Sequence, residues 1–229
     1  MNKLILISFL LEMLTFGADI KAQDCATLAP PPPSWIFNPT LQSAQADGQT
    51  YLLRIFIHIV RNVNGITNID VNNALTTIPD YLNSSYSSAD IQFQLVGFDY
   101  IDSEYYNSID TREKQDALLS TNFHNNAIDI YVVGTNTNTG GAAGRAASIP
   151  ATALFLHGGY YYQSSLPHEM GHCLGLWHTH HGTVNEGGSD THQCKELVDG
   201  SNGATCGDYI SDTPADPIYG MVVNTMVQL

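Results

Sequence analysis

The residues best suited to do chemistry in this sequence lie between positions 168 and 178. His168 and His172 are four residues apart, so a helix would place both imidazoles on one face, where they can share a metal ion. Gly175 can adopt a positive φ and end the helix in a sharp turn, which would let His178 reach the same ion. Three neutral imidazoles with one open position are the ligand set of a catalytic zinc site.

Glu169 directly follows the first of these histidines, and its carboxylate can reach the open position. We expect it to act as the general base: it takes the proton from a zinc-bound water as that water attacks a carbonyl. The same group would then pass the proton to the leaving amine. Bound zinc lowers the pKa of the water towards about 7. The pattern therefore predicts zinc-dependent hydrolysis of peptide bonds.

A helix must carry these side chains, and its start is marked in the sequence. Ser164 and Ser165 are candidate N-caps, and Pro167 fits the first turn. Apolar residues supply a packing surface for this helix: Leu166, Met170, Leu174 and Trp177.

Strands and helices alternate before this helix, which predicts an α/β or α+β layered structure. Runs of apolar and β-branched residues predict strands at 51–60, 91–100, 127–134 and 153–156. Apolar residues at helical spacing predict helices at 70–81 and 111–122. The glycine-rich segment 140–149 fits an irregular edge strand. His58 falls inside the first strand, where we expect a structural histidine rather than a metal ligand.

The composition excludes several classes of function. The 229 residues include 22 acids but only 8 Lys and Arg, for a net charge of −14. This charge argues against nucleic-acid binding and against docking on anionic lipid. An apolar content of 43% argues against a mainly disordered chain. After His178 the periodicity is lost, and 186–216 holds seven acids and one lysine.

The first segment resembles a secretory signal. Lys3 precedes an apolar stretch from residue 4 to 17, and Ala22 is a plausible cleavage position. We therefore expect a signal peptide at 1–22, a secreted protein, and an exposed N-terminal arm or pro-segment at 23–50. No later segment approaches the roughly 20 apolar residues of a membrane span, so no membrane association is expected after signal removal.

Export would permit disulfides among Cys25, Cys173, Cys194 and Cys206. Cys194 and Cys206 are close in the chain and are the first choice for a bridge. Cys173 fits a small buried residue. For Cys25 three alternatives remain: a disulfide, a free thiol, or a thiolate that blocks the zinc as a latency switch.

The motif at 168–178 matches the metzincin signature in full, and the chain resembles the pappalysin-type zinc endopeptidases. The residues that carry this resemblance are HEMGHCLGLWHTH at 168–180 and CKELVDGSNGATCGDYISDTPADP at 194–217. The resemblance implies an α+β, metzincin-like zincin fold: a twisted mixed β-sheet with an active-site helix and a backing helix, above a small irregular C-terminal lobe. A catalytic domain at 51–229 would then divide into an upper lobe, 51–178, and a lower lobe, 179–229.

The resemblance also implies site residues and partners. His168, His172 and His178 would bind one zinc ion, Glu169 would be the base, and an extended protein or peptide substrate would pair with the 140–149 edge strand. The acidic loop suits calcium. The better candidates for calcium ligands are Asp208, Asp212 and Thr213.

Two departures from the family pattern stand out. Gly203 and Ser211 occupy positions where relatives often have cysteine, so family disulfide pairings do not transfer. Metzincins also place a methionine turn beneath the zinc. Met226 only faintly matches that turn, because Gln228 stands where a tyrosine is common. We therefore expect a C-terminal end that is incomplete. The alternative to a secreted zinc metalloendopeptidase is a non-catalytic zinc- or calcium-binding or interaction module derived from a truncated metallopeptidase. The oligomeric state is not predicted.

Overall fold

A computed structural model of the chain describes residues 25–32, 34–37, 48–181 and 194–211. The expected signal peptide at 1–22 lies outside these residues, as do Asp212, Thr213 and Met226. No helix of the described part is long and apolar enough to cross a membrane.

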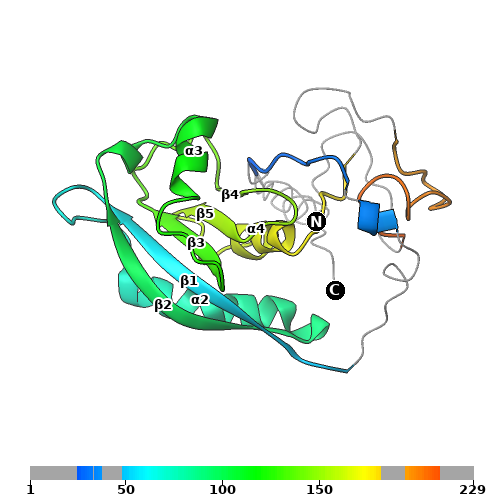
Figure 1. Cartoon of the computed structure of the whole chain (residues 1–229), viewed down its shortest axis with the longest axis horizontal. Helices are drawn as coiled ribbons and strands as arrows, with labels where there is room; N and C mark the ends of the chain where they lie inside the picture. Colours follow the sequence, from blue (N-terminus) through cyan, green and yellow to red (C-terminus); the bar gives the residue numbers. More distant parts are fainter. Residues whose placement is uncertain (1–24, 33, 38–47, 182–193, 212–229) are drawn as a thin grey trace, which may run out of the picture.

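Five strands form one twisted sheet in the order β2-β1-β3-β5-β4 (Figure 1). They are β1 (Tyr51–Arg61), β2 (Ile91–Asp102), β3 (Ile128–Val133), β4 (Gly144–Ala146) and β5 (Ala153–His157). Neighbouring strands are parallel except for β4, which runs antiparallel to β5. The mixed sheet is therefore confirmed, with the predicted irregular strand at its edge.

Among the described residues, three α-helices cover the sheet: α2 (Val71–Tyr86), α3 (Arg112–Leu118) and α4 (Ser165–Cys173). Short 3-10 turns lie at Ser34–Phe37, Ser87–Ala89 and Tyr105–Asn107. Helices α2 and α4 share one core with one face of the sheet, and α3 contributes to a second core on the other face. This arrangement confirms an α+β fold in which α4, the helix that carries His168 and His172, packs beside the longer α2.

The central strands divide their side chains between the two cores. Ile55, Ile57 and Ile59 of β1 are fully buried in the core shared with α2 and α4. Val60 and Tyr131 belong to the core on the α3 side. Burial of one such isoleucine is worth about 1.5–3 kcal/mol relative to exposure, so these strands form a rigid base for the loops that follow them.

The predicted element boundaries were largely right, with two differences in helix length. The helix predicted at 70–81 starts after the N-cap Asp70, whose side chain accepts a hydrogen bond from the Asn73 amide, and it continues through Pro79 to Tyr86. The helix predicted at 111–122 starts after the N-cap Thr111 but ends at Leu118. Among the described residues that follow α4, no helix or strand occurs, as expected for the irregular lobe.

Candidate metal centre

Helix α4 presents two of the predicted ligands from one face. His168 and His172 lie one turn apart, and their ring centroids are 4.7 Å apart. Leu166 and Met170 are fully buried in the core with the sheet, which fixes the rotation of the helix. Ser164 is the N-cap residue, but its side chain makes no capping hydrogen bond, so packing rather than a cap positions this helix.

A glycine turn brings the third histidine back to the same place. Gly175 has a φ of +98°, which side chains other than glycine rarely tolerate. The Gly175 amide donates to His172 O at 3.0 Å, and the Leu176 amide donates to Gly171 O at 2.9 Å. This pair of bonds is a Schellman C-cap. It reverses the chain, so that His178 faces the helix as predicted.

The three imidazoles converge in a way that suits a cation. The Nε2 atom of His172 lies 3.1 Å from Nε2 of His168 and 3.1 Å from Nε2 of His178. Its Nδ1 lies 2.7 Å from Leu176 O, so Nδ1 carries the proton and Nε2 presents a lone pair. One lone pair cannot accept two hydrogen bonds at once, whereas a metal ion at the centre would satisfy all three nitrogens. The residues present therefore fit zinc.

Burial keeps His168 in the form that binds metal. Desolvation, with the nearby His178 and His180, lowers the pKa of His168 from 6.5 to about 4. A neutral imidazole is the ligand species. At neutral pH, His168 can therefore bind a cation without first losing a proton.

Cys25 lies at the same centre. Its Sγ is 3.5 Å from Nε2 of His172, and the four ligand atoms of Cys25, His168, His172 and His178 lie within 4.8 Å of one another. Cys25 is a free cysteine, which removes the disulfide from the three alternatives for this residue. Burial, and then the charge of Glu169, raise the pKa of its thiol. A bound cation would have the opposite effect and favour the thiolate.

Glu169 occupies the position expected of a general base beside the metal ligands. It is 1% exposed, and burial raises the pKa of its carboxyl group. Its Oε2 accepts hydrogen bonds from the Thr27 hydroxyl at 2.8 Å and from the Ala146 amide at 2.9 Å. The edge strand and the N-terminal arm therefore both hold this carboxylate.

Thr27 is a residue that sequence analysis missed. It is 4% exposed, and its hydroxyl also accepts a bond from the Ala146 amide at 2.8 Å. A threonine two residues after a cysteine carries no recognisable signal by itself. Only the folded arm shows that Thr27 contacts Glu169 while Cys25 contacts His172.

The arm containing both residues, 25–32, runs along the edge strand. Cys25 forms a parallel bridge with Gly144, and the Ala26 amide donates to Gly144 O at 3.2 Å. Arg112 donates from Nη1 to Ala26 O at 3.2 Å. The edge strand β4 therefore already accepts an extended segment of chain.

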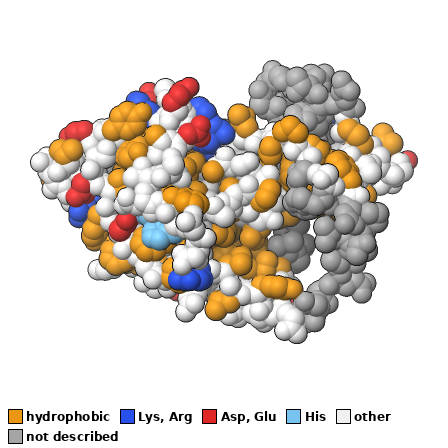
Figure 2. Space-filling view, in the orientation of Figure 1, with side chains coloured by type: hydrophobic (Ala, Val, Ile, Leu, Met, Phe, Trp, Pro, Cys, Tyr) orange, Lys and Arg blue, Asp and Glu red, His pale blue; other side chains and the backbone are white. Residues whose placement is uncertain are grey.

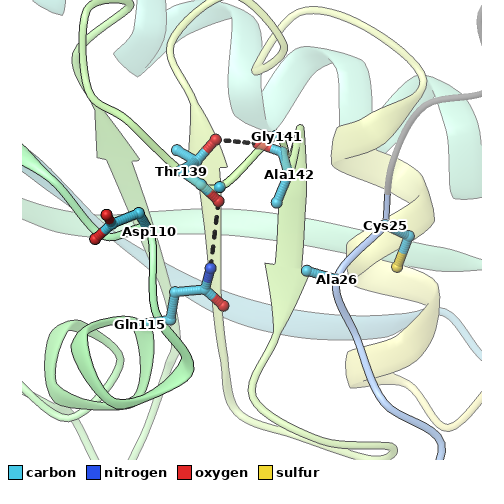
Figure 3. A pocket seen from close by; sticks show the side chains of 8 residues that line it. Cys25, Ala26, Asp110, Gln115, Thr139, Gly141 and Ala142 are labelled. Atoms are coloured by element: carbon cyan, nitrogen blue, oxygen red, sulfur yellow. Dashed lines mark hydrogen bonds between the residues drawn. The ribbon is translucent and has the colours of Figure 1, made fainter. Parts of the chain in front are cut away.

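A pocket of about 250 Å³ opens beside this arm (Figure 3). Cys25 and Ala26 line it on the arm side, and the opposite wall includes Asp110 and Gln115. The Gln115 side chain donates to Thr139 O at 3.4 Å, which ties α3 to the loop before β4. An extended peptide on β4 would have room here for one side chain.

The C-terminal described segment confirms one prediction and leaves two untested. Cys194 and Cys206 form a disulfide. Asp208 is 2% exposed and accepts a bond from the Ile210 amide at 3.0 Å. Neither carboxylate oxygen of Glu196 has a hydrogen-bond partner within the described segments, and burial, followed by the charge of Asp208, raises its pKa. The other candidate calcium ligands, Asp212 and Thr213, fall outside those segments.

Charges are mixed on the face seen in Figure 2. Acidic and basic side chains lie next to one another there rather than in separate patches. This face therefore shows no broad basic surface of the kind that nucleic acid requires.

Comparison with known proteins adds a distant similarity. A promirolysin mutant from Tannerella forsythia has a solved structure that matches this chain with a TM-score of 0.44 and 17% sequence identity, over 71% of this chain and 68% of that one. No protein-family profile matches the sequence, and no curated protein matches it. At this level of similarity, the function has to be inferred from the chain's own site.

Proposed function

We propose that the chain is a secreted zinc-dependent metalloendopeptidase, held in a latent form by its N-terminal arm. The observation that carries the proposal is the convergence of three imidazole nitrogens on one point beside a buried glutamate. His168, His172 and His178 would hold the zinc. When bound, zinc would supply Lewis acidity towards water and towards the scissile carbonyl.

Glu169 would move the proton in this reaction. Its carboxylate, positioned by the Ala146 amide at 2.9 Å, would take a proton from the attacking water and donate it to the leaving amine. Burial raises the pKa of this group, and a raised pKa brings a carboxyl closer to the pH at which proton transfer in both directions is efficient.

The edge strand would bind an extended stretch of substrate. The arm supports this proposal, because the Ala26 amide bonds to Gly144 O. Main-chain bonding of this type recognises any extended peptide, and side-chain pockets then add selectivity. The pocket lined by Asp110 and Gln115 is a candidate for such a subsite.

Latency would follow from two contacts of the arm. Cys25 lies where a fourth ligand would bind, and four ligands close a zinc site that catalysis needs open. Thr27 hydrogen-bonds the general base. While both contacts persist, Cys25 would occupy the open coordination position and Thr27 would engage the general base.

We also propose calcium in the acidic lobe. The buried Glu196 carboxylate, without a hydrogen-bond partner among the described residues, and the adjacent Asp208 offer oxygen ligands of the kind calcium prefers. Added Ca²⁺ should raise the unfolding temperature of the intact chain but not that of a Glu196→Gln variant. Equal shifts in the two proteins would contradict this assignment.

The main proposal is tested by zinc content and peptide hydrolysis. We expect one zinc bound at the three histidines, hydrolysis of a quenched peptide by the Cys25→Ala variant, and loss of that activity with a chelator or with Glu169→Ala. The rival is a non-catalytic metal-binding module. Zinc at the three histidines without any turnover in Cys25→Ala would favour that rival. Absence of zinc at these histidines would contradict both.

A further inference from the structure

A second cluster of metal-binding side chains lies on the other face of the sheet from α4. It consists of His58 on β1, Asp129 on β3 and His124 from the loop before β3, and their ligand atoms all lie within 4.8 Å of one another. Ile57 and Ile59 face the core with α2 and α4, so the alternation of β1 directs His58 to the opposite side. This cluster is therefore separate from the site at His168.

One nitrogen of each histidine in the cluster lies close to the same carboxylate oxygen. Oδ1 of Asp129 lies 3.0 Å from Nε2 of His58 and 2.8 Å from Nδ1 of His124. Ligand atoms about 2.0–2.1 Å from a tetrahedral zinc are themselves about 3.3 Å apart. The spacing is thus close to that of a ligand set, and similar to the 3.1 Å between the imidazoles of the first site.

The second nitrogen of His58 and the second oxygen of Asp129 also have hydrogen-bond partners. The Nδ1 atom of His58 lies 2.6 Å from Oδ1 of Asp99, and Asn122 donates to the second oxygen of Asp99 at 2.8 Å. The His124 amide donates to Oδ2 of Asp129 at 2.8 Å. A carboxylate on the outer nitrogen of a histidine is the usual support of a metal-binding imidazole, because it fixes the tautomer and the ring orientation.

Burial and stacking keep this geometry in place. His58 and Asp129 are both 0% exposed, whereas the His124 side chain is 33% exposed. Tyr131 stacks on His58 with centroids 4.3 Å apart, and Phe56 stacks on His124 at 3.9 Å. The cluster therefore has one partly open side, through which an ion could enter and where water could complete its coordination.

We propose that His58, His124 and Asp129 form a second site for a zinc-type divalent cation, with Asp99 as the residue that orients His58. The ion joins β1, β3 and the loop before β3, and its role is to stabilise the sheet. The competing description is a metal-free chain of hydrogen bonds through the same four side chains, and the two descriptions differ in metal content.

The test counts zinc in the full chain after chelator stripping and reloading with Zn²⁺ alone, measured by mass spectrometry after gel filtration. We expect about two zinc ions per wild-type chain and about one in His168→Ala/His172→Ala or in His124→Ala. Combining all three substitutions should leave about none. His157→Ala is the matched control, because the His157 imidazole lies 2.9 Å from Thr135 O and accepts from the Gly159 amide, away from both clusters, and it should keep both ions.

Two further measurements keep the proposal falsifiable if a variant folds poorly. Asp99→Asn should weaken zinc binding at the second site by about 10- to 100-fold, as loss of a supporting carboxylate does elsewhere. In the His168→Ala/His172→Ala variant, Zn²⁺ should still raise the unfolding temperature. A wild-type chain that binds a single zinc, lost completely in His168→Ala/His172→Ala and kept in His124→Ala, would overturn the second site.

Discussion

Replacing Thr27 with valine tests how the arm holds the general base. Valine has nearly the shape of threonine but cannot donate the 2.8 Å hydrogen bond to Oε2 of Glu169. The Ala146 amide still reaches the same oxygen at 2.9 Å, so the carboxylate keeps one partner. The substitution therefore weakens the arm while it preserves the catalytic groups.

The size of the effect follows from the type of bond. A buried hydrogen bond to a charged group contributes about 1.5–3 kcal/mol, and each 1.4 kcal/mol is a factor of ten in an equilibrium constant. Loss of the Thr27 contact should thus shift the balance between the bound and released arm by about 10- to 150-fold. The retained Ala146 bond places the expected value near the lower end.

The assay is hydrolysis of a quenched peptide by unprocessed, zinc-loaded chain, with intactness checked by mass spectrometry. We expect the basal rate of hydrolysis by Thr27→Val to exceed that of the wild type by about 10- to 150-fold, near the lower end of this range. Thr27→Ser retains a hydroxyl and serves as the control, with a rate close to that of the wild type. Cys25→Ala gives the upper limit, because it removes the contact of the arm with the metal ligands.

One result would refute this reasoning. If Cys25→Ala activates the chain but Thr27→Val and Thr27→Ser both behave as the wild type, the Thr27 contact does not contribute to latency. The hydrogen bond would then be a consequence of the position of the arm rather than a cause of it.

Three further predictions test the site and its supports. In the Cys25→Ala background, Glu169→Gln should lower turnover by at least about 100-fold while zinc content stays unchanged, as expected for loss of a general base; an active Gln variant would exclude that role. Gly144→Ala should lower the free energy of unfolding by about 1–3 kcal/mol, because its Cβ would lie 2.9 Å from Cγ of Glu169 and 3.1 Å from Phe155 O. The control Gly159→Ala, whose Cβ meets only His157 at 3.7 Å, should unfold as the wild type does. In the metal-free chain, the folded-state pKa of His168, about 4, lies below its ordinary 6.5, so protonation favours unfolding and this contribution to stability is lost as the pH falls from 6.5 towards 4. Melting curves in chelator should show a steeper loss over that range for the wild type than for His168→Asn, and parallel curves would contradict the assignment.

The convergence of His168, His172 and His178 could be predicted because it depends on local geometry. The four-residue spacing of His168 and His172 and the positive φ of Gly175 are set by one helix and its C-cap. The strands of the sheet could be predicted equally well, since their apolar runs are short and well separated. Such features require only the periodicity of the backbone and the conformational freedom of glycine.

The contacts of the arm and the cluster of His58, His124 and Asp129 could not be predicted from local sequence patterns. Thr27 and Glu169 are separated by 142 positions, and His58 and Asp129 by 71. Long-range pairing of this kind depends on strand order, which places β1 between β2 and β3. The sequence alone therefore favoured a merely structural role for His58 and left the role of Cys25 open.

The covalent connection between the arm and β1 has a consequence for how latency would end. Because Cys25 and Thr27 belong to the same chain as the site they contact, the arm is present at an effective concentration of the order of millimolar, whatever the dilution of the protein. Cleavage of one peptide bond between residue 28 and Tyr51 would replace this effective concentration with the actual concentration of the released fragment. Extracellular dilution would then make release irreversible, so one cleavage event would convert a reversible equilibrium into permanent activation.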